Sequence, residues 1–153
     1  MKTIFDQTVR NELTNRIGKL SSESKAEWGK MNVYQMTKHC NRWNNWVLGK
    51  EDYADYTYKQ DFIGKIFGKW ALKSNTKNDK PIGKNMPAGK AFTIKEIDGD
   101  VEAQKIKWIQ LIADYEYFSN PGFVHDFFGK MSKTQIGTFA YKHFDHHLRQ
   151  FGV

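Results

Sequence analysis

A chain of 153 residues has a suitable length for one domain with one hydrophobic core, and its 15% aromatic content excludes a disordered protein. No stretch approaches about 18 uncharged apolar residues, which excludes a membrane-spanning helix, and residues 1–6 lack the apolar run of a signal peptide. The net charge of +7 fits an acidic partner or a lysine-rich surface, and the even spread of lysines favours the surface. The single cysteine, Cys40, excludes an internal disulfide, and we expect a cytoplasmic protein.

Two helices are predicted in the first third of the chain. The first spans roughly residues 3–20, because apolar residues recur there every three or four positions. They are Val9, Leu13, Ile17 and Leu20. A short helical turn over residues 22–29 follows, and a second helix begins after Asn32 as its N-cap and ends at Gly49. The apolar stripe of this helix is Val33, Met36, Cys40, Trp43 and Val47.

The middle of the chain, residues 50–98, is expected to be a long connection rich in glycine and proline. It contains one amphipathic segment, residues 62–71, with lysines on or beside the side opposite its apolar residues. The apolar residues are Phe62, Ile63, Ile66, Phe67, Trp70 and Ala71, and the lysines are Lys59, Lys65, Lys69 and Lys73. Residues 74–98 are polar and rich in turn-forming residues, which predicts an extended connection.

Two more helices are predicted after this connection. The third begins near Asp100 and is stopped by the turn sequence of residues 120–122. Its apolar stripe is Trp108, Leu111, Ile112, Tyr115 and Phe118. Ser132 and Gln135 form a capping box for a fourth helix that runs almost to the last residue. The sequence thus predicts an all-α fold, a four-helix bundle with a long crossover between the second and third helices, as one domain over residues 1–153.

The last helix carries the strongest functional signal. His143 and His147 are four residues apart and share a helical face, on which Gln150 and the apolar residues Ile136, Phe139 and Ala140 also lie. Two imidazoles at this spacing can bind one metal ion from a single helix. His39 is the candidate third ligand, beside the apolar stripe of the second helix and nearly in register with Trp43 and Trp46. Three neutral imidazoles leave a coordination position open, as in catalytic sites.

The histidines also have structural interpretations. His39 alone fits an ordinary hydrogen-bonded core residue. His146 lies about 60° from the His143–His147 face and fits a supporting group, a substrate contact or partly exposed surface. His125 lies in the loop before the last helix, where it could close over the site or form a loop hydrogen bond. Cys40 is interpreted as a small buried apolar residue.

Two longer motifs resemble a known family. Trp28 to His39 has the pattern Trp-Gly-Lys-Met-x-x-x-Gln-Met-x-x-His, and His143 to Gly152 has His-x-x-His-His-Leu-Arg-Gln-Phe-Gly. Both are similar to an uncharacterised subfamily of the DinB-like superfamily of four-helix metalloenzymes, and the resemblance covers essentially the whole chain. It implies a divalent metal, zinc, nickel or iron, bound by three histidines that map to His39, His143 and His147. Relatives often have His-Pro-Phe-Phe-Gly before the last helix, whereas here Asp126 replaces the proline.

Several functions follow from this site. Better-known relatives use the metal to activate a low-molecular-weight thiol, which implies an S-transferase type of enzyme with a small-molecule substrate. A hydrolase that activates water is the second reaction; the absence of a carboxylate on the metal face favours the thiol. Gln150 would orient a ligand or bound water, and Trp43 and Trp46 would line the pocket. The alternatives are non-catalytic metal binding and a basic module in which residues 59–73 bind an anionic membrane or nucleic acid, although no nucleic-acid motif is present.

The last helix has a second apolar strip besides its histidine face. The strip consists of Tyr141, Phe144, Leu148 and Phe151, and leaves only a polar wedge for water. The wedge consists of Thr138, Lys142, Asp145 and Arg149. Either residues 62–71 cover the strip within the chain, or a second copy covers it in a homodimer.

Overall fold

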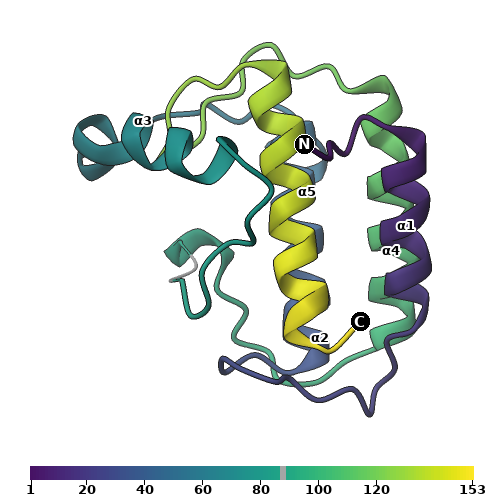
Figure 1. Ribbon diagram of the computed structural model, residues 1–153. Helices are drawn as coiled ribbons and strands as arrows, with labels where there is room; N and C mark the ends of the chain where they lie inside the picture. Colours follow the sequence, from purple (N-terminus) through teal and green to yellow (C-terminus); the bar gives the residue numbers. More distant parts are fainter. Residues whose placement is uncertain (87–88) are drawn as a thin grey trace.

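In the computed structural model, which describes residues 1–86 and 89–153, five α-helices are joined by loops and short 3-10 turns (Figure 1). The α-helices are α1 (Gln7–Gly18), α2 (Val33–Leu48), α3 (Phe62–Thr76), α4 (Val101–Ala113) and α5 (Lys133–Gln150). The 3-10 turns are η1 (Glu51–Tyr53), η2 (Lys90–Phe92) and η3 (Asp114–Tyr117). Helices α1, α2, α4 and α5 run alongside one another, and α3 projects from the side of this bundle (Figure 1). The predicted all-α bundle is confirmed, with α3 as an additional helix inside the crossover.

The two helices that carry the histidines begin where the sequence predicts. Asn32 and Gln35 form a reciprocal capping box at the start of α2, and Ser132 and Gln135 form another at the start of α5. Helix α2 ends at Gly49, which adopts the left-handed conformation with φ of 66°. These end signals fix the register of both helices, and therefore the level at which their histidines meet.

The other predicted boundaries need correction. Helix α1 is shorter than the predicted residues 3–20, because residues 3–6 turn toward α5, where the Ile4 N–H donates to the Gly137 carbonyl at 3.1 Å. Residues 22–29 form turns and bends instead of a helical turn. Helix α4 ends at Ala113 and tightens into η3 before the predicted stop at residues 120–122. None of the described helices is both long and apolar enough to cross a membrane.

The second apolar strip of α5 is buried by the bundle itself. Phe144 is fully buried, with its ring 5.5 Å from that of Trp43 in α2, 5.7 Å from Trp108 in α4 and 6.5 Å from Tyr115 in η3. Leu148 is fully buried as well. Neither residues 62–71 nor a second copy is needed to cover these residues, because α5 packs them against the other long helices.

The polar wedge of α5 is also less exposed than predicted. Thr138 and Lys142 are buried, and the Lys142 ammonium donates to the backbone carbonyls of Asn75 and Asn78 at 2.6 and 2.8 Å. These carbonyls lie at and just beyond the C-terminal end of α3, where a cation is favourable. At Lys142 the wedge thus receives the end of α3, whereas Arg149 is exposed as predicted.

The crossover differs from its prediction in two respects. Helix α3 continues to Thr76, so the extended connection begins later than the predicted residue 74. The turn η2 interrupts this connection. Residues 87–88, which also belong to it, lie outside the described residues. The large apolar side chains of α3 point into solvent, contrary to the expectation that they cover the bundle. They are Phe62, Ile63, Ile66, Phe67 and Trp70.

Candidate metal centre

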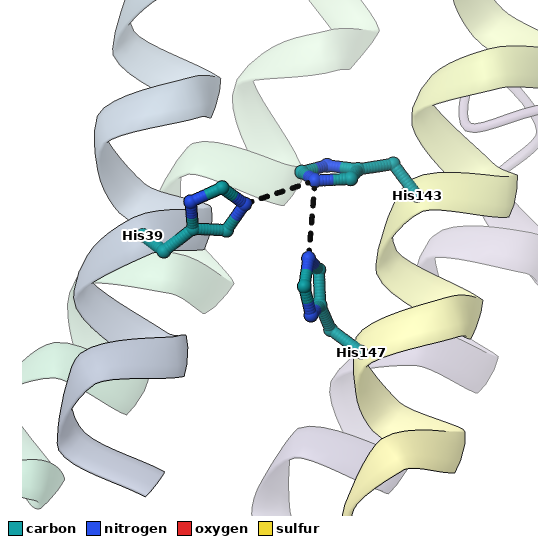
Figure 2. Close-up of side chains that lie close together, drawn as sticks. All are labelled: His39, His143 and His147. Carbon is teal, nitrogen blue, oxygen red and sulfur yellow. Dashed lines mark hydrogen bonds between the residues drawn. The ribbon is translucent and has the colours of Figure 1, made fainter. Parts of the chain in front are cut away.

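Three imidazoles converge between α2 and α5. His39 comes from α2, and His143 and His147 lie one turn apart on α5 (Figure 2). The Nε2 atom of His143 is 3.2 Å from the Nε2 atom of His39 and 3.2 Å from that of His147. Two nitrogens bound to one tetrahedral zinc at about 2.0–2.1 Å lie about 3.4 Å apart, so these spacings fit a shared ion. Among the described residues, these three are the group of side chains that could hold a metal.

The hydrogen bond of His39 fixes the direction of its lone pair. Its Nδ1 lies 3.0 Å from the backbone carbonyl of Phe92, in the crossover. A carbonyl only accepts, so Nδ1 carries the proton and donates it. The Nε2 lone pair of His39 therefore points toward the other two imidazoles, as a metal ligand requires.

His147 is held in the same way by Gln150. The His147 Nδ1 lies 3.0 Å from Gln150 Oε1, and Gln150 Nε2 donates to the Trp28 carbonyl at 2.8 Å. The carbonyl of Trp28 fixes which end of the amide is the donor, so Oε1 is the atom that accepts from His147. The Nε2 lone pair of His147 consequently points into the site as well.

His143 lies between these two lone pairs. A proton on its Nε2 can form one good hydrogen bond, so one of the facing lone pairs would stay unsatisfied. Its own Nδ1 is buried and has no hydrogen-bond partner in the described structure. One cation bound by all three Nε2 atoms satisfies every lone pair that faces the centre, which is the strongest structural argument for metal at this position.

Burial keeps the three imidazoles neutral. It lowers the pKa of His39, and it lowers the pKa values of His143 and His147 well below the ordinary value for histidine. The positive charge that the neighbouring histidines would carry adds to the effect. Neutral imidazole is the form that binds metal, so the site is ready for a cation at neutral pH.

Aromatic side chains enclose one side of the centre. The ring of Trp43 lies 4.5 Å from the ring of His143, and the ring of Phe139 is nearly parallel to that of His143 at 6.4 Å. Trp46 lies further out, where it packs against Phe92 at 5.0 Å. Of the two predicted pocket tryptophans, the structure therefore places Trp43 against the histidines and Trp46 behind the residue that supports His39.

The remaining candidates lie outside the group of three. His146 is half-buried, with its ring 5.1 Å from that of His147. The Nδ1 atom of His125 lies 2.9 Å from Asp126 Oδ1 and 3.1 Å from the backbone nitrogen of Phe127, so His125 belongs to the loop hydrogen bonding that the sequence left as an alternative. Cys40 is fully buried, and burial raises its thiol pKa well above the usual value, so it stays protonated.

Two supporting groups were not deduced from the sequence. The Phe92 carbonyl that positions His39 is a backbone group, which no residue type reveals. Gly29, in the quoted Trp-Gly motif, has φ of +84°, and a Cβ atom there would lie 2.5 Å from Gln150 Nε2. Glycine at this position lets the chain approach Gln150 closely enough for the Trp28 carbonyl to orient it. The Trp-Gly motif was the sequence feature that could have pointed to Gly29, although the motif does not reveal that this glycine makes room for Gln150.

A separate cavity lies on the opposite side of α5. It has a volume of about 630 Å³ and is lined by the N-terminal segment, α1 and the polar side of α5, including Glu12, Lys142 and Asp145. None of the three histidines lines it. A substrate in this cavity would not reach the metal centre.

Comparison with known proteins identifies the family. Residues 4–152 match the family described as "Protein of unknown function (DUF1569)". Because the match covers nearly the whole chain, the protein belongs to this family, whose description gives no activity. No curated protein and no solved structure matches the chain. A function therefore has to be argued from the geometry of the site.

Proposed function

We propose that this member of the DUF1569 family is a metal-dependent enzyme, in which His39, His143 and His147 hold one divalent ion and leave a position open for a small substrate. The observation that carries the proposal is the pair of inward lone pairs on His39 and His147, each fixed by a carbonyl oxygen on the far side of its ring. The resemblance to the DinB-like superfamily supports zinc, nickel or iron as the ion. We place the activity in the cytoplasm, where small thiols stay reduced.

A divalent ion at such a site supplies Lewis acidity, which lowers the pKa of a thiol or water molecule bound to it. The protein contributes orientation and shielding. Gln150 keeps His147 in the tautomer that can bind, and Trp43 covers the face of His143. His143 is the partly exposed member of the three, so substrate would approach from its side.

A small thiol fits the site better than water as the nucleophile. Hydrolysis usually needs a general base, and no carboxylate joins the three histidines among the described residues. A thiol needs only to lose its proton to solvent before its sulfur forms a bond to an electrophilic carbon, whose leaving group departs with the bonding electrons. We therefore propose thiol transfer as the reaction and hydrolysis as the second candidate.

The test begins with untagged protein, because a nickel column would load the site artificially. We expect about one divalent ion per chain by elemental analysis. Chelated and metal-restored protein are then compared on a panel of small thiols and electrophiles. Turnover that requires both the metal and His143 supports the proposal, whereas metal-dependent hydrolysis without thiol transfer favours the second reaction. Stoichiometric metal without either activity would contradict an enzymatic role and leave non-catalytic metal binding.

A further inference from the structure

Helix α3 contacts the rest of the protein through its smallest residues. Gly64 and Gly68 are buried, and a Cβ atom at either position would lie within 2.2 Å of the Phe127 carbonyl oxygen. Leu72, four residues on, is the third buried residue of the helix. These residues form one edge of α3, by which the helix docks closely on the loop that precedes α5.

The opposite side of α3 exposes an apolar face, consisting of Phe62, Ile63, Ile66, Phe67 and Trp70. Each of these side chains is between 55% and 77% exposed. At 100° per residue they occupy a sector of about 140°, whose centre points away from the glycine edge. Helix α3 projects from the bundle (Figure 1). Isolated surface hydrophobics need no explanation, but five on one face of such a helix form a contiguous patch.

Lysines border this apolar face without partners of their own. Residues 59–80 contain six lysines and two aspartates. The lysines are Lys59, Lys65, Lys69, Lys73, Lys77 and Lys80. All six are exposed, and none forms an ion pair among the described residues, whereas Lys2, Lys38, Lys50, Lys105 and Lys107 all do. This positive charge is available for an anionic partner.

We propose that α3 is a peripheral membrane-binding helix, which lies in the surface of an anionic lipid bilayer with the apolar face inserted among the acyl chains. Aromatic and aliphatic residues on one face, with lysines beside them, are what such interfacial helices require. The lysine side chains extend along the helix surface to the headgroups. The activity proposed for the histidine site does not depend on this role.

Charge favours an anionic bilayer over a second copy of the chain or nucleic acid as the partner of the apolar face. A second copy that paired through the same face would bring two rows of unpaired lysines together, at a cost in like-charge repulsion. Nucleic acid would satisfy the lysines but would leave Ile63 and Ile66 against phosphate and water. An anionic bilayer satisfies both the charges and the apolar side chains.

Vesicle sedimentation with the full, metal-loaded chain tests the proposal. We expect binding to phosphatidylcholine vesicles that contain about a third phosphatidylserine, weak binding to pure phosphatidylcholine, and a loss of affinity at high salt. The Trp70 environment becomes apolar on binding, so fluorescence emission should shift to shorter wavelength, and the shift should be smaller in Trp70→Ser.

Matched variants separate the apolar and electrostatic contributions. Ile66→Ser with Trp70→Ser should weaken binding more than tenfold, while Ile106→Ser with Tyr117→Ser, which changes exposed residues elsewhere, should have little effect. Lys65→Gln with Lys69→Gln should weaken binding more than tenfold, at about fivefold per lysine. The double variant Lys19→Gln with Lys25→Gln removes the same charge elsewhere on the surface and should weaken vesicle binding less.

Two results would overturn the proposal. One is equal or absent binding to anionic and neutral vesicles. The other is a wild-type dimer in light scattering that Ile66→Ser with Trp70→Ser converts to a monomer, which would assign the apolar face to self-association. All the altered side chains are exposed, so circular dichroism and metal content should remain those of the wild type, and a negative result would not reflect unfolding.

Discussion

Helices α3 and α5 have similar sequence patterns and opposite surroundings. In both, apolar residues recur at helical spacing and lysine lies on another side. Phe144 and Leu148 of α5 are fully buried, whereas Ile66 and Trp70 of α3 are 59% and 75% exposed. The pattern therefore determines which residues share a face, but the arrangement of the neighbouring helices determines whether that face is covered.

The difference follows from how each helix meets its neighbours. Helix α5 packs against the other long helices, so most of its second apolar strip and His147 of its histidine face are buried. Helix α3 docks through Gly64 and Gly68, whose missing side chains allow the backbone of Phe127 to come close. A helix that docks through glycines leaves its large residues free, and these residues are then available for a partner.

The largest expected effect compares one apolar residue from each helix. Phe144→Ala removes a fully buried ring and leaves a cavity, so we expect the free energy of unfolding to fall by about 3–5 kcal/mol. Ile66→Ala changes an exposed side chain and should stay within about 0.5 kcal/mol of the wild type. Urea unfolding measures both variants. Similar losses in the two would mean that the apolar face of α3 is covered in solution.

The second prediction concerns the metal ligands. His143→Ala removes the imidazole that faces both others, and should weaken metal binding by more than about 100-fold, since supporting residues alone are worth about 10–100-fold. His146→Ala, which removes a neighbouring histidine outside the group, should retain stoichiometric metal. Elemental analysis and competition with a chelator provide the measurement. Metal retained in His143→Ala but lost in His146→Ala would reverse the assignment.

Much of the bundle could be predicted because its signals are local. The capping boxes at Asn32 and Ser132 and the glycine at residue 49 mark helix ends by chemistry that involves only neighbouring residues. The spacing of His143 and His147 likewise fixes their common face. These features depend on the helix itself, so the sequence alone was enough to state them.

The remainder depends on contacts between distant segments. The cover of Phe144 by Trp108 and Tyr115, and the burial of Lys142 under the end of α3, follow from how the helices pack, which no periodicity reveals. The Phe92 carbonyl reaches His39 from 53 positions along the chain. His39 was the candidate third ligand because of its place on the second helix and because of the family resemblance; the distances that bring it to the other two histidines became visible only in the structure.

A third and smaller effect tests the support behind the ligands. Gly29→Ala places a methyl group against Gln150 and forces a residue with a side chain into positive φ, so Gln150 should move away from His147. We expect metal affinity to fall by about 10–100-fold, as for other residues that orient a ligand. Gly18→Ala is the matched control, because nothing lies within 4 Å of the added atom. Equal affinities in the two variants would show that Gln150 does not position His147.

The smallest effect is the pH dependence of the metal-free protein. Burial lowers the pKa values of His39, His143 and His147, so the folded chain binds fewer protons than the unfolded chain once pH falls below about 6.5. Acid therefore favours unfolding: the stabilisation is present above that pH and is lost as pH falls, with a slope of at most about 1.4 kcal/mol per pH unit for each histidine.

His147→Gln should reduce this slope in urea unfolding with chelator present. Ile66→Ala should leave it unchanged, because α3 contains no histidine or carboxylate. A slope of the opposite sign would mean that the histidines are stabilised in their charged form, which would remove the argument that the site is prepared for a cation.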